Sequence, residues 1–257
     1  MRLRFDPGLE GAFWSEMGRL PGYPCGETIR LRRMIFEVGA VRRVPEILRS
    51  IDARAPGRLL VVMDTTPMRR GPDDLKPLIL SIHQSAGWTA EIAVVEPEAN
   101  GQVHTDFQQI EKVQSHLCSG CAVGAIGSGT ITDIAKHACH RFELASGASV
   151  PLLAYQTANS VSAYTSNMAP TFVQGVKRTL PSRYPDALVC DLETRRDAPY
   201  AMTAAGVGDL LAAAVSFADW YLAYCLGMDA TYTPLAETLM GSLGDALLEL
   251  APNMCST

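Results

Sequence analysis

Short apolar runs alternate with amphipathic stretches over most of the chain. Five runs have the length of a strand and are unbroken, at residues 35–39, 59–63, 90–95, 122–126 and 150–155. The first four are followed by segments with helical spacing, at residues 41–50, 73–86, 106–118 and 130–141. Unbroken apolar runs are typical of parallel strands covered on both faces, and an intervening helix provides the crossover that a parallel pair needs. Residues 33–160 therefore predict an α/β fold with a doubly wound parallel sheet of Rossmann-like type.

The pattern changes after residue 160. Residues 160–185 are rich in Ser, Thr, Asn and Pro, which favours an excursion such as a hairpin, and the run at 187–191 predicts one more strand. From residue 199 onward the spacing is helical, with helices expected at 201–226 and 234–250. We therefore expect an α/β domain over residues 1–198 and an incomplete all-helical domain over residues 199–257. Because two helices bury little apolar surface by themselves, they are expected to pack on the first domain or to belong to a larger helical domain.

Composition and charge narrow the classes of function. Hydrophobic residues make up 47% and charged residues 19% of the 257 residues, as in an ordinary globular protein. The net charge of −5 and the lack of clustered Lys and Arg argue against a nucleic-acid partner. A membrane span needs roughly 18 or more apolar residues without charge. The nearest run, residues 198–218, is interrupted by Asp209, so no membrane span is expected.

The seven cysteines are odd in number and scattered, which predicts reduced thiols in a cytoplasmic protein. Cys118 and Cys121 form a CxxC pair. A zinc site would need a second pair of ligands, and the nearest candidates, His137 and His140, lie beyond a glycine-rich loop and are expected on the solvent face of their helix. We therefore interpret the CxxC pair as buried thiols beside a strand.

The most informative segment is the glycine-rich loop between the fourth predicted strand and its helix, GAIGSGT at residues 124–130. Glycines allow the backbone to approach a pyrophosphate closely, and the first N–H groups of the helix favour negative charge. Thr130 is expected to cap this helix, with Asp133 completing a pair that resembles a capping box. A tight turn that binds no ligand is the alternative, because glycine-rich turns alone are weakly specific.

Residues 127–136, GSGTITDIAK, resemble the signature of glycerol-1-phosphate dehydrogenases, which are related to glycerol dehydrogenase, the iron-containing alcohol dehydrogenases and 3-dehydroquinate synthase. Further segments resemble motifs of that family in the same order, at residues 35–48, 61–66, 164–181, 191–199 and 206–220. The glycines follow the fourth strand rather than the first, unlike the common dinucleotide fingerprint. The resemblance implies an oxidoreductase that depends on NAD(P) and a metal and interconverts dihydroxyacetone phosphate and sn-glycerol-1-phosphate, or a related polyol.

The resemblance also implies roles for individual residues. Those assigned to the cofactor NAD(P) are Asp64, Gly127, Ser128, Gly129, Thr130, Asp133, Thr157 and Ser160. Asp64 ends a strand, where a carboxylate accepts from an adenosine ribose hydroxyl; a turn residue is an equal alternative. Thr157 and Ser160 either line the nicotinamide side or serve the turn that they lie in. Lys177 is assigned to a substrate phosphate, with a solvated lysine as the alternative.

The expected metal site is incomplete. By resemblance, Asp209 is a ligand of the family's catalytic Zn²⁺ or Fe²⁺, which polarises the alcohol oxygen; a helix cap is the alternative. The family completes the site with two histidines, yet the last histidine of this sequence is His140. Ser162 stands where the family has an aspartate close to the substrate, and it joins Lys177 as the second position assigned to catalysis.

Three functions follow from these residues. The first is a dehydrogenase acting on a small phosphorylated substrate, expected to form a homo-oligomer. The second is a truncated or degenerate relative without catalysis, which binds a nucleotide or only a partner subunit. The third is a cyclase like 3-dehydroquinate synthase, and the GSGT and DIAK segments speak against it.

Overall fold

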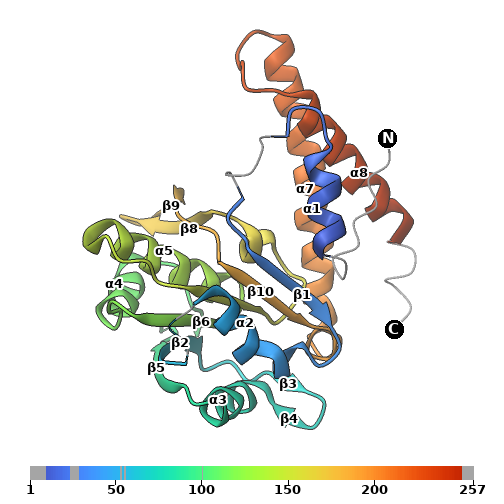
Figure 1. The fold of residues 1–257 in the computed structure, drawn as a ribbon. Helices are drawn as coiled ribbons and strands as arrows, with labels where there is room; N and C mark the ends of the chain where they lie inside the picture. The colour runs from blue at the N-terminus through green and yellow to red at the C-terminus, as the bar shows by residue number, and fades with distance from the viewer. Residues whose placement is uncertain (1–9, 24–28, 53, 55, 100, 251–257) are drawn as a thin grey trace.

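The computed structural model describes residues 10–23, 29–52, 54, 56–99 and 101–250 (Figure 1). At its centre is a six-stranded sheet in which every neighbouring pair of strands is parallel. In spatial order the strands are β1 (Arg33–Glu37), β10 (Ala187–Asp191), β7 (Leu152–Gln156), β6 (Cys121–Gly127), β2 (Arg58–Asp64) and β5 (Thr89–Val95). The predicted doubly wound parallel sheet is confirmed, because each predicted apolar run forms one strand of it.

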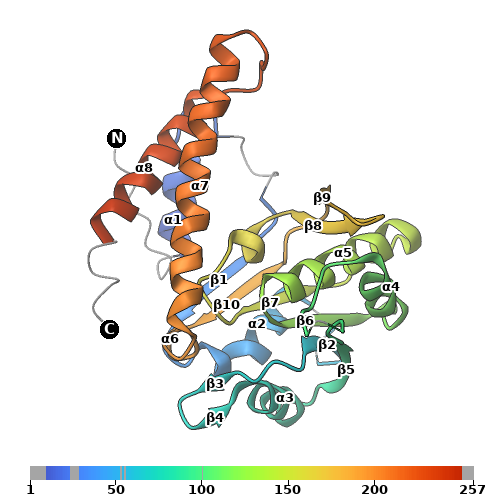
Figure 2. The same cartoon turned by 180° about the vertical axis from the view of Figure 1, so that it is seen from behind.

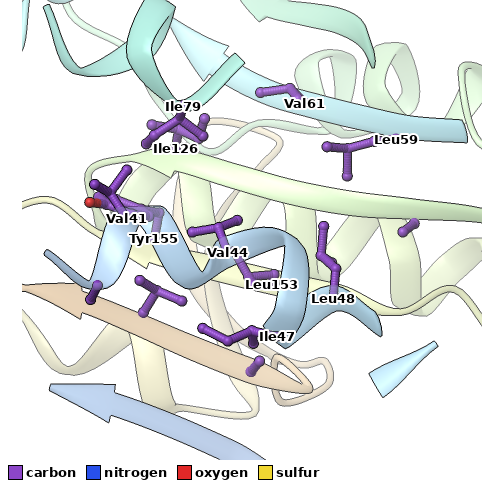
Figure 3. Close-up of a cluster of buried hydrophobic side chains, with 14 of the residues drawn as sticks. Val41, Val44, Ile47, Leu48, Leu59, Val61, Ile79, Ile126, Leu153 and Tyr155 are labelled. Atoms are coloured by element: carbon purple, nitrogen blue, oxygen red, sulfur yellow. The ribbon is translucent and has the colours of Figure 1, made fainter. Parts of the chain in front are cut away.

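Helices cover both faces of the sheet, which is why β6 is buried along its whole length and β2 is buried from Leu59 onward. The helices are η1 (Ala40–Arg43), α2 (Val44–Ile51) and α3 (Leu75–Ser85) on one face, and α4 (Phe107–Ser115) and α5 (Gly129–Ser146) on the other. On the first face Val44, Ile47 and Ile79 pack with Tyr155 of β7 in one buried cluster (Figure 3). A second cluster joins α4 and α5 to the opposite side of the same strands.

The loop after β2 contains a small antiparallel pair that the sequence did not predict, β3 (Arg69–Arg70) and β4 (Asp73–Asp74). Arg70 is buried, and its Nε lies 3.1 Å from Asp191 Oδ2 at the end of β10. Asp191 is fully buried and also accepts from the backbone N–H of Val41. Because a buried charge is costly unless it is paired and hydrogen-bonded, this contact fixes the loop against β10.

The polar segment after β7 folds as the expected excursion. It contains a short 3-10 helix, η2 (Ser162–Thr165), and then an antiparallel hairpin of β8 (Met168–Val173) and β9 (Val176–Pro181). The hairpin lies over α5, outside the parallel sheet (Figure 2). The chain then returns through β10 and the short helix α6 (Leu192–Arg196).

Beyond α6 the chain is helical, as predicted. Two long helices, α7 (Tyr200–Cys225) and α8 (Pro234–Leu250), lie against each other and extend away from the sheet (Figures 1 and 2). The first helix of the chain, α1 (Glu10–Gly18), joins them: its Met17 lies in a cluster with Leu235 of α8. The neighbouring Trp14 packs against the cluster that includes Met34 of β1. Residues 10–18 therefore contact both the sheet and the helical segment.

None of the residues of α7 is buried, and large apolar side chains such as Leu222 and Leu226 beside it are exposed. By length and hydropathy alone α7 is long and apolar enough to cross a membrane, which the sequence analysis did not expect. Composition is a weak criterion here, because Asp209 lies within the helix and holds a backbone N–H of the α/β domain. We interpret α7 as a helix of the helical segment, the first part of which contacts the α/β domain at Gly206 and Asp209.

The backbone of α7 lies close to the sheet domain at Gly206. A Cβ atom at this position would lie 1.8 Å from the backbone oxygen of Asn159, in the loop after β7. Gly208 lies two residues further along the same helix, and a Cβ atom there would have no atom within 4 Å. Gly206 therefore lets the helix backbone rest directly on the loop.

We predict opposite effects of alanine at these two glycines. Gly206→Ala forces α7 away from residue 159 and should destabilise the chain by about 1–3 kcal/mol, the usual cost of overpacking. Gly208→Ala should be neutral or stabilise by up to about 1 kcal/mol, because alanine favours helix and nothing obstructs it. Thermal unfolding of both variants beside the parent measures this. Equal unfolding temperatures for the two variants would contradict the contact at residue 206.

Candidate functional site

Two adjoining cavities lie at the carboxyl ends of β2, β6 and β7, the edge where open α/β sheets bind ligands. The larger has a volume of about 580 Å³ and reaches from Asp64 to Met202 at the start of α7. The smaller, of about 260 Å³, lies between the start of α5 and the β8–β9 hairpin. Val103, His104, Ser128 and Ser160 line both cavities, so the two form one continuous depression.

The glycine-rich loop runs along the boundary of these cavities. Strand β6 ends at Gly127 and α5 begins at Gly129, so the helix starts earlier than predicted. Ser128, not Thr130, is the N-cap residue, and its side chain makes no capping hydrogen bond. The first intrahelical bond is donated by the Thr132 N–H to the Ser128 oxygen. The preceding N–H groups of α5 have no partner within the helix, and they point out of its open end toward the cavities.

Packing also favours glycine at two positions of this loop, Gly127 and Gly129. A Cβ atom at Gly127 would lie 2.7 Å from Ile131 Cγ1, and one at Gly129 would lie 2.5 Å from Val161 Cγ1. Any larger residue at position 129 would collide with η2 and its neighbours before it met a ligand. The glycines thus permit a close turn whether or not a pyrophosphate is bound.

Asp133 does not complete a capping box with Thr130, which corrects the sequence prediction. It lines the smaller cavity, where it is 5% exposed and its Oδ1 lies 2.8 Å from Lys136 Nζ. The helix start at Gly129 explains the difference, because Asp133 falls one turn inside α5 rather than at its third position. Burial raises the pKa of the Asp133 carboxyl to about 6, although Lys136 and then Lys177 lower it.

Lys136 is fully buried and was part of the quoted signature without an assigned role. Its Nζ donates to the backbone oxygens of Ala163, Ser166 and Met168 at 2.7, 3.0 and 2.9 Å. Burial lowers the pKa of Lys136, and Asp133 opposes that shift. One side chain of α5 thereby holds η2 and the start of the hairpin, which form a wall of the smaller cavity.

Asp64 lies at the carboxyl end of β2 and lines the larger cavity. Both of its carboxylate oxygens already have partners: Oδ1 lies 2.5 Å from Lys76 Nζ, and Oδ2 accepts from Thr66 Oγ1 at 2.8 Å. Lys76 is 9% exposed and also donates to the backbone oxygens of Asp64 and Thr66. The turn role and the cavity position therefore coexist in one residue, and Lys76 is a nearby cation that sequence analysis missed.

The two polar residues after β7 differ in their surroundings. Thr157 is buried, and its Oγ1 donates to the Gly127 oxygen at 2.8 Å. Tyr164 donates to the same oxygen at 3.1 Å, so both side chains fix the end of β6. Ser160 is half-buried and lines both cavities. Thr157 lines the larger cavity as well, but its hydroxyl is engaged within the turn.

Lys177 lies on β9 and lines the smaller cavity together with Ser128, Gly129 and Thr130. It is exposed, and no hydrogen bond or ion pair holds its ammonium among the contacts of the described residues. A cation is thus brought to the same cavity as the open end of α5, from a hairpin far along the chain. His104, which sequence analysis did not select, lines both cavities and lies 5.4 Å from the Phe172 ring, centroid to centroid.

Asp209 and Ser162 are in direct contact, but their contact does not form a metal site. Asp209 Oδ2 accepts from the backbone N–H of Ser162 at 3.0 Å, so the carboxylate of α7 caps the start of η2. Within the described residues no group of three or more His, Cys, Asp or Glu side chains is arranged to hold a metal ion. His137 and His140 lie on α5, and His137 is buried rather than on the solvent face, with its ring 6.1 Å from that of Phe107.

The buried Asp133 carboxyl predicts a pH-dependent component of stability. Its pKa of about 6 in the folded chain exceeds the ordinary 3.8, so between these values the folded chain keeps a proton that the unfolded chain loses. This contribution is present in full below the lower value and is lost as pH rises through the higher one, at up to about 1.4 kcal/mol per pH unit. Asp133→Asn should therefore lose less stability than the parent between about pH 4 and about pH 6.5.

Urea unfolding at a series of pH values measures this difference. Asp73→Asn, at an exposed position of β4, is the matched control and should follow the parent. If the free energies of unfolding of Asp133→Asn and the parent changed with pH by the same amount, residue 133 would not retain its proton in the folded chain.

The fold and the position of the cavities define the architecture that dinucleotide-binding α/β proteins use. A family model described as iron-containing alcohol dehydrogenase matches residues 35–199, which is more than half of the chain. The chain belongs to the iron-containing alcohol dehydrogenase family. This confirms the family-level prediction made from the glycine-rich signature and the ordered motifs around it.

Relatives of known sequence agree with this assignment. The glycerol-1-phosphate dehydrogenase (NAD(P)+) of Bacillus subtilis is 34% identical over 164 residues, covering 63% of this chain and 40% of that protein. The enzyme of the same name from Methanothrix thermoacetophila is 24% identical over 223 residues, covering 87% and 58%. The chain spans 35–40% of the length of the first curated relatives that it matches.

Solved structures share the fold. An alcohol dehydrogenase from Oenococcus oeni superposes with a TM-score of 0.61 at 14% identity, covering 90% of this chain and 62% of that one. The glycerol dehydrogenase of Schizosaccharomyces pombe superposes with a TM-score of 0.55 at 18% identity, covering 72% and 42%. At such low identity these structures establish the architecture, and the function has to be argued from the site.

Proposed function

We propose that this chain is the nucleotide-binding part of an NAD(P)-dependent dehydrogenase that acts on a small phosphorylated substrate. One observation carries the proposal: the open amino end of α5 and the exposed ammonium of Lys177 face the same cavity. Free N–H groups at a helix start and a flexible cation are the usual partners of phosphate groups. Because curated relatives are named glycerol-1-phosphate dehydrogenase, the proposed substrate pair is dihydroxyacetone phosphate and sn-glycerol-1-phosphate, or a related polyol phosphate.

In this proposal the larger cavity holds the adenosine half of NAD(P), next to Asp64. The pyrophosphate lies across Gly127, Ser128 and Gly129, beside Thr130. The nicotinamide half extends toward Ser160. The name of the Bacillus subtilis relative includes NAD(P)+, and a fold neighbour, sulfoacetaldehyde reductase from Bifidobacterium kashiwanohense, was solved in complex with NAD+. Lys177, which lies on the opposite wall of the smaller cavity, then binds the substrate phosphate or the pyrophosphate.

The choice between NADH and NADPH depends on Asp64 and Lys76. An isolated carboxylate would repel a ribose 2′-phosphate and favour NADH. Here the Lys76 ammonium lies 2.5 Å from Asp64 and offsets much of that charge. A mixed coenzyme preference is therefore the proposal for this chain.

The residues described do not fit the metal that the family uses. Asp209 is a single carboxylate whose Oδ2 is taken by the Ser162 N–H, and all five histidines of the sequence precede it. Catalytic zinc sites typically hold the ion with about three protein ligands. No step through Zn²⁺ or Fe²⁺ is derived for this chain, and the contribution of its own residues is to bind and orient the nucleotide and the phosphate.

This disagreement favours a second candidate function. A non-catalytic relative that keeps the nucleotide cavity would need the α5 loop and Asp64, but no metal ligands. The capping contact of Asp209 with η2 supports it, because the carboxylate then has a structural role of its own. The exposed apolar side chains of α7 and α8, including Leu211 and Leu248, also suit contact with another subunit, which keeps the homo-oligomer as a proposal.

Nucleotide binding can be tested at Ser128, whose hydroxyl caps nothing and lines both cavities. Ser128→Asp should keep or improve helix stability, since aspartate is a good N-cap, but should repel the pyrophosphate and weaken NAD(P)H binding at least about tenfold. Ser128→Asn, of nearly the same size and without charge, is the control and should bind within about threefold of the parent. Fluorescence titration with NADH and NADPH gives the affinities, and equal binding by both variants would remove the α5 loop from the site.

The two candidate functions differ in metal content and turnover. We expect the dialysed chain to retain far less than one zinc or iron per chain, because one carboxylate competes poorly for these ions. It should also fail to oxidise NADH with dihydroxyacetone phosphate while still binding NADH. Elemental analysis and absorbance assays measure both. One tightly held metal per chain together with turnover would establish the dehydrogenase and place its missing ligands outside the described residues.

A further inference from the structure

The CxxC pair lies in a tight turn at the amino end of β6, directly after α4. The Cys121 N–H donates to the Cys118 oxygen at 3.2 Å, and Gly120 between them has a φ of 89°, a left-handed conformation that glycine accommodates. Such a four-residue turn brings its first and last Cα atoms within about 7 Å of each other. Disulfides span Cα separations of about 4.4–6.8 Å, so the turn holds the two cysteines at a distance that a disulfide can bridge.

The two thiols have different surroundings. Cys121 is fully buried, and its Sγ accepts from the Cys118 N–H at 3.4 Å, so it is turned back toward its partner. Cys118 is only half-buried, and Arg58 Nη1 lies 3.5 Å from its Sγ. Burial raises the pKa of Cys121, and contact with the Cys118 thiol adds to this shift. Cys118 is thus the accessible member with a cation beside it, and Cys121 is the shielded member.

The turn has the apolar cluster of α4 and α5 on one side and charged groups at its exposed side. Arg58 also pairs with Glu91 of β5, and Glu91 accepts from His116 Nδ1 at 2.8 Å. Arg54 Nη1 lies 3.8 Å from the position that a Cβ of Gly120 would take. A partly exposed cysteine beside a guanidinium is the usual setting of a reactive thiol, in contrast to a cysteine enclosed by apolar groups.

We propose that Cys118 and Cys121 form a redox-active pair that is oxidised to a disulfide by a small-molecule disulfide. In the first step the Cys118 thiolate attacks one sulfur of the oxidant, forming a mixed disulfide and expelling one thiolate. In the second step the Cys121 thiol gives up its proton and attacks Cys118 Sγ, expelling the other half of the oxidant as a second thiol. Two protein thiols are oxidised and one disulfide is reduced to two thiols, so atoms and electrons balance.

The pair is separate from the proposed nucleotide site. Strand β6 runs from Cys121 to Gly127, and at about 3.3 Å per residue its ends are on the order of 20 Å apart. The redox pair lies at the amino ends of the strands and the cavities at their carboxyl ends. Oxidation of Cys118 and Cys121 should therefore leave NADH binding unchanged, and the outcome of either test does not decide the other.

Other cysteines of the described chain provide controls. Cys139 and Cys190 are buried, and Cys225 is exposed on α7. Cys225 forms no CxxC pair in the sequence, and no other described cysteine lies on α7 or α8, so we expect a small disulfide to leave an adduct on it. Its behaviour defines what an ordinary exposed cysteine does under the same conditions.

The test treats the reduced chain with glutathione disulfide and identifies the products by mass spectrometry of peptides. We expect the parent to form the Cys118–Cys121 disulfide and to release two glutathione molecules per pair, while Cys225 keeps a glutathione adduct. Cys121→Ala should accumulate glutathione on Cys118 to at least about tenfold the level in the parent, because nothing resolves it. Cys118→Ala should leave Cys121 unmodified, since that thiol is shielded.

Two further results bear on the proposal. Arg58→Gln should slow modification of Cys118 several-fold relative to Cys225 in the same sample, because the cation beside the thiol is lost. A stable glutathione adduct on Cys118 in the parent, at the level found in Cys121→Ala, would overturn the pairing. So would modification of Cys118 no faster than Cys139. Because the release of glutathione is measured on the parent, the proposal remains testable even if a variant fails to fold.

Discussion

The site depends on the contacts of one buried ammonium group, that of Lys136. Removing a lysine from water is costly, and here the cost is offset by the Asp133 carboxylate and three backbone oxygens of the segment after β7. The same segment is held from two other directions, by the packing of Val161 against Gly129 and by Asp209 of α7. The wall of the cavity is therefore positioned at three points, by Lys136 within α5, by Gly129 at the start of α5 and by Asp209 on α7.

This arrangement explains why charged side chains in the signature serve the fold. Asp64 and Lys76 form a second such pair at the end of β2, and Arg70 with Asp191 forms a third at the end of β10. Each pair secures a loop at the carboxyl edge of the sheet, where the backbone leaves regular structure and its polar groups need partners. A rigid rim around the cavity follows, with Ser128, Ser160 and Lys177 as the polar groups that remain available to a ligand.

The sequence predicted the sheet well because burial on both faces leaves a direct mark: β2 and β6 consist almost entirely of buried residues. It also predicted the hairpin and both long helices. It did not predict β3 and β4, because their position depends on Arg70 reaching Asp191, 121 residues away in the chain. Lys76 and Lys136 were missed as functional supports for a similar reason, since the amphipathic pattern of a helix says nothing about which distant carbonyl a lysine meets. The prediction of Thr130 as the N-cap was wrong, because the N-cap is Ser128, two residues earlier. The helix begins at Gly129, where the absence of a side chain leaves room for Val161.

The collisions that a side chain would cause at Gly127 and Gly129 have a consequence for how such chains diverge over time. If selection for nucleotide binding ceased, packing would still favour these glycines, since a Cβ at either position would force Ile131 or Val161 to shift. After loss of ligand binding, substitutions would then appear first at positions whose side chains face the cavity, such as Ser128 and Lys177. The glycine pattern by which the loop is recognised would change later. A sequence search that relies on the glycine pattern will therefore also find chains that keep the shape of the turn but no longer bind the ligand.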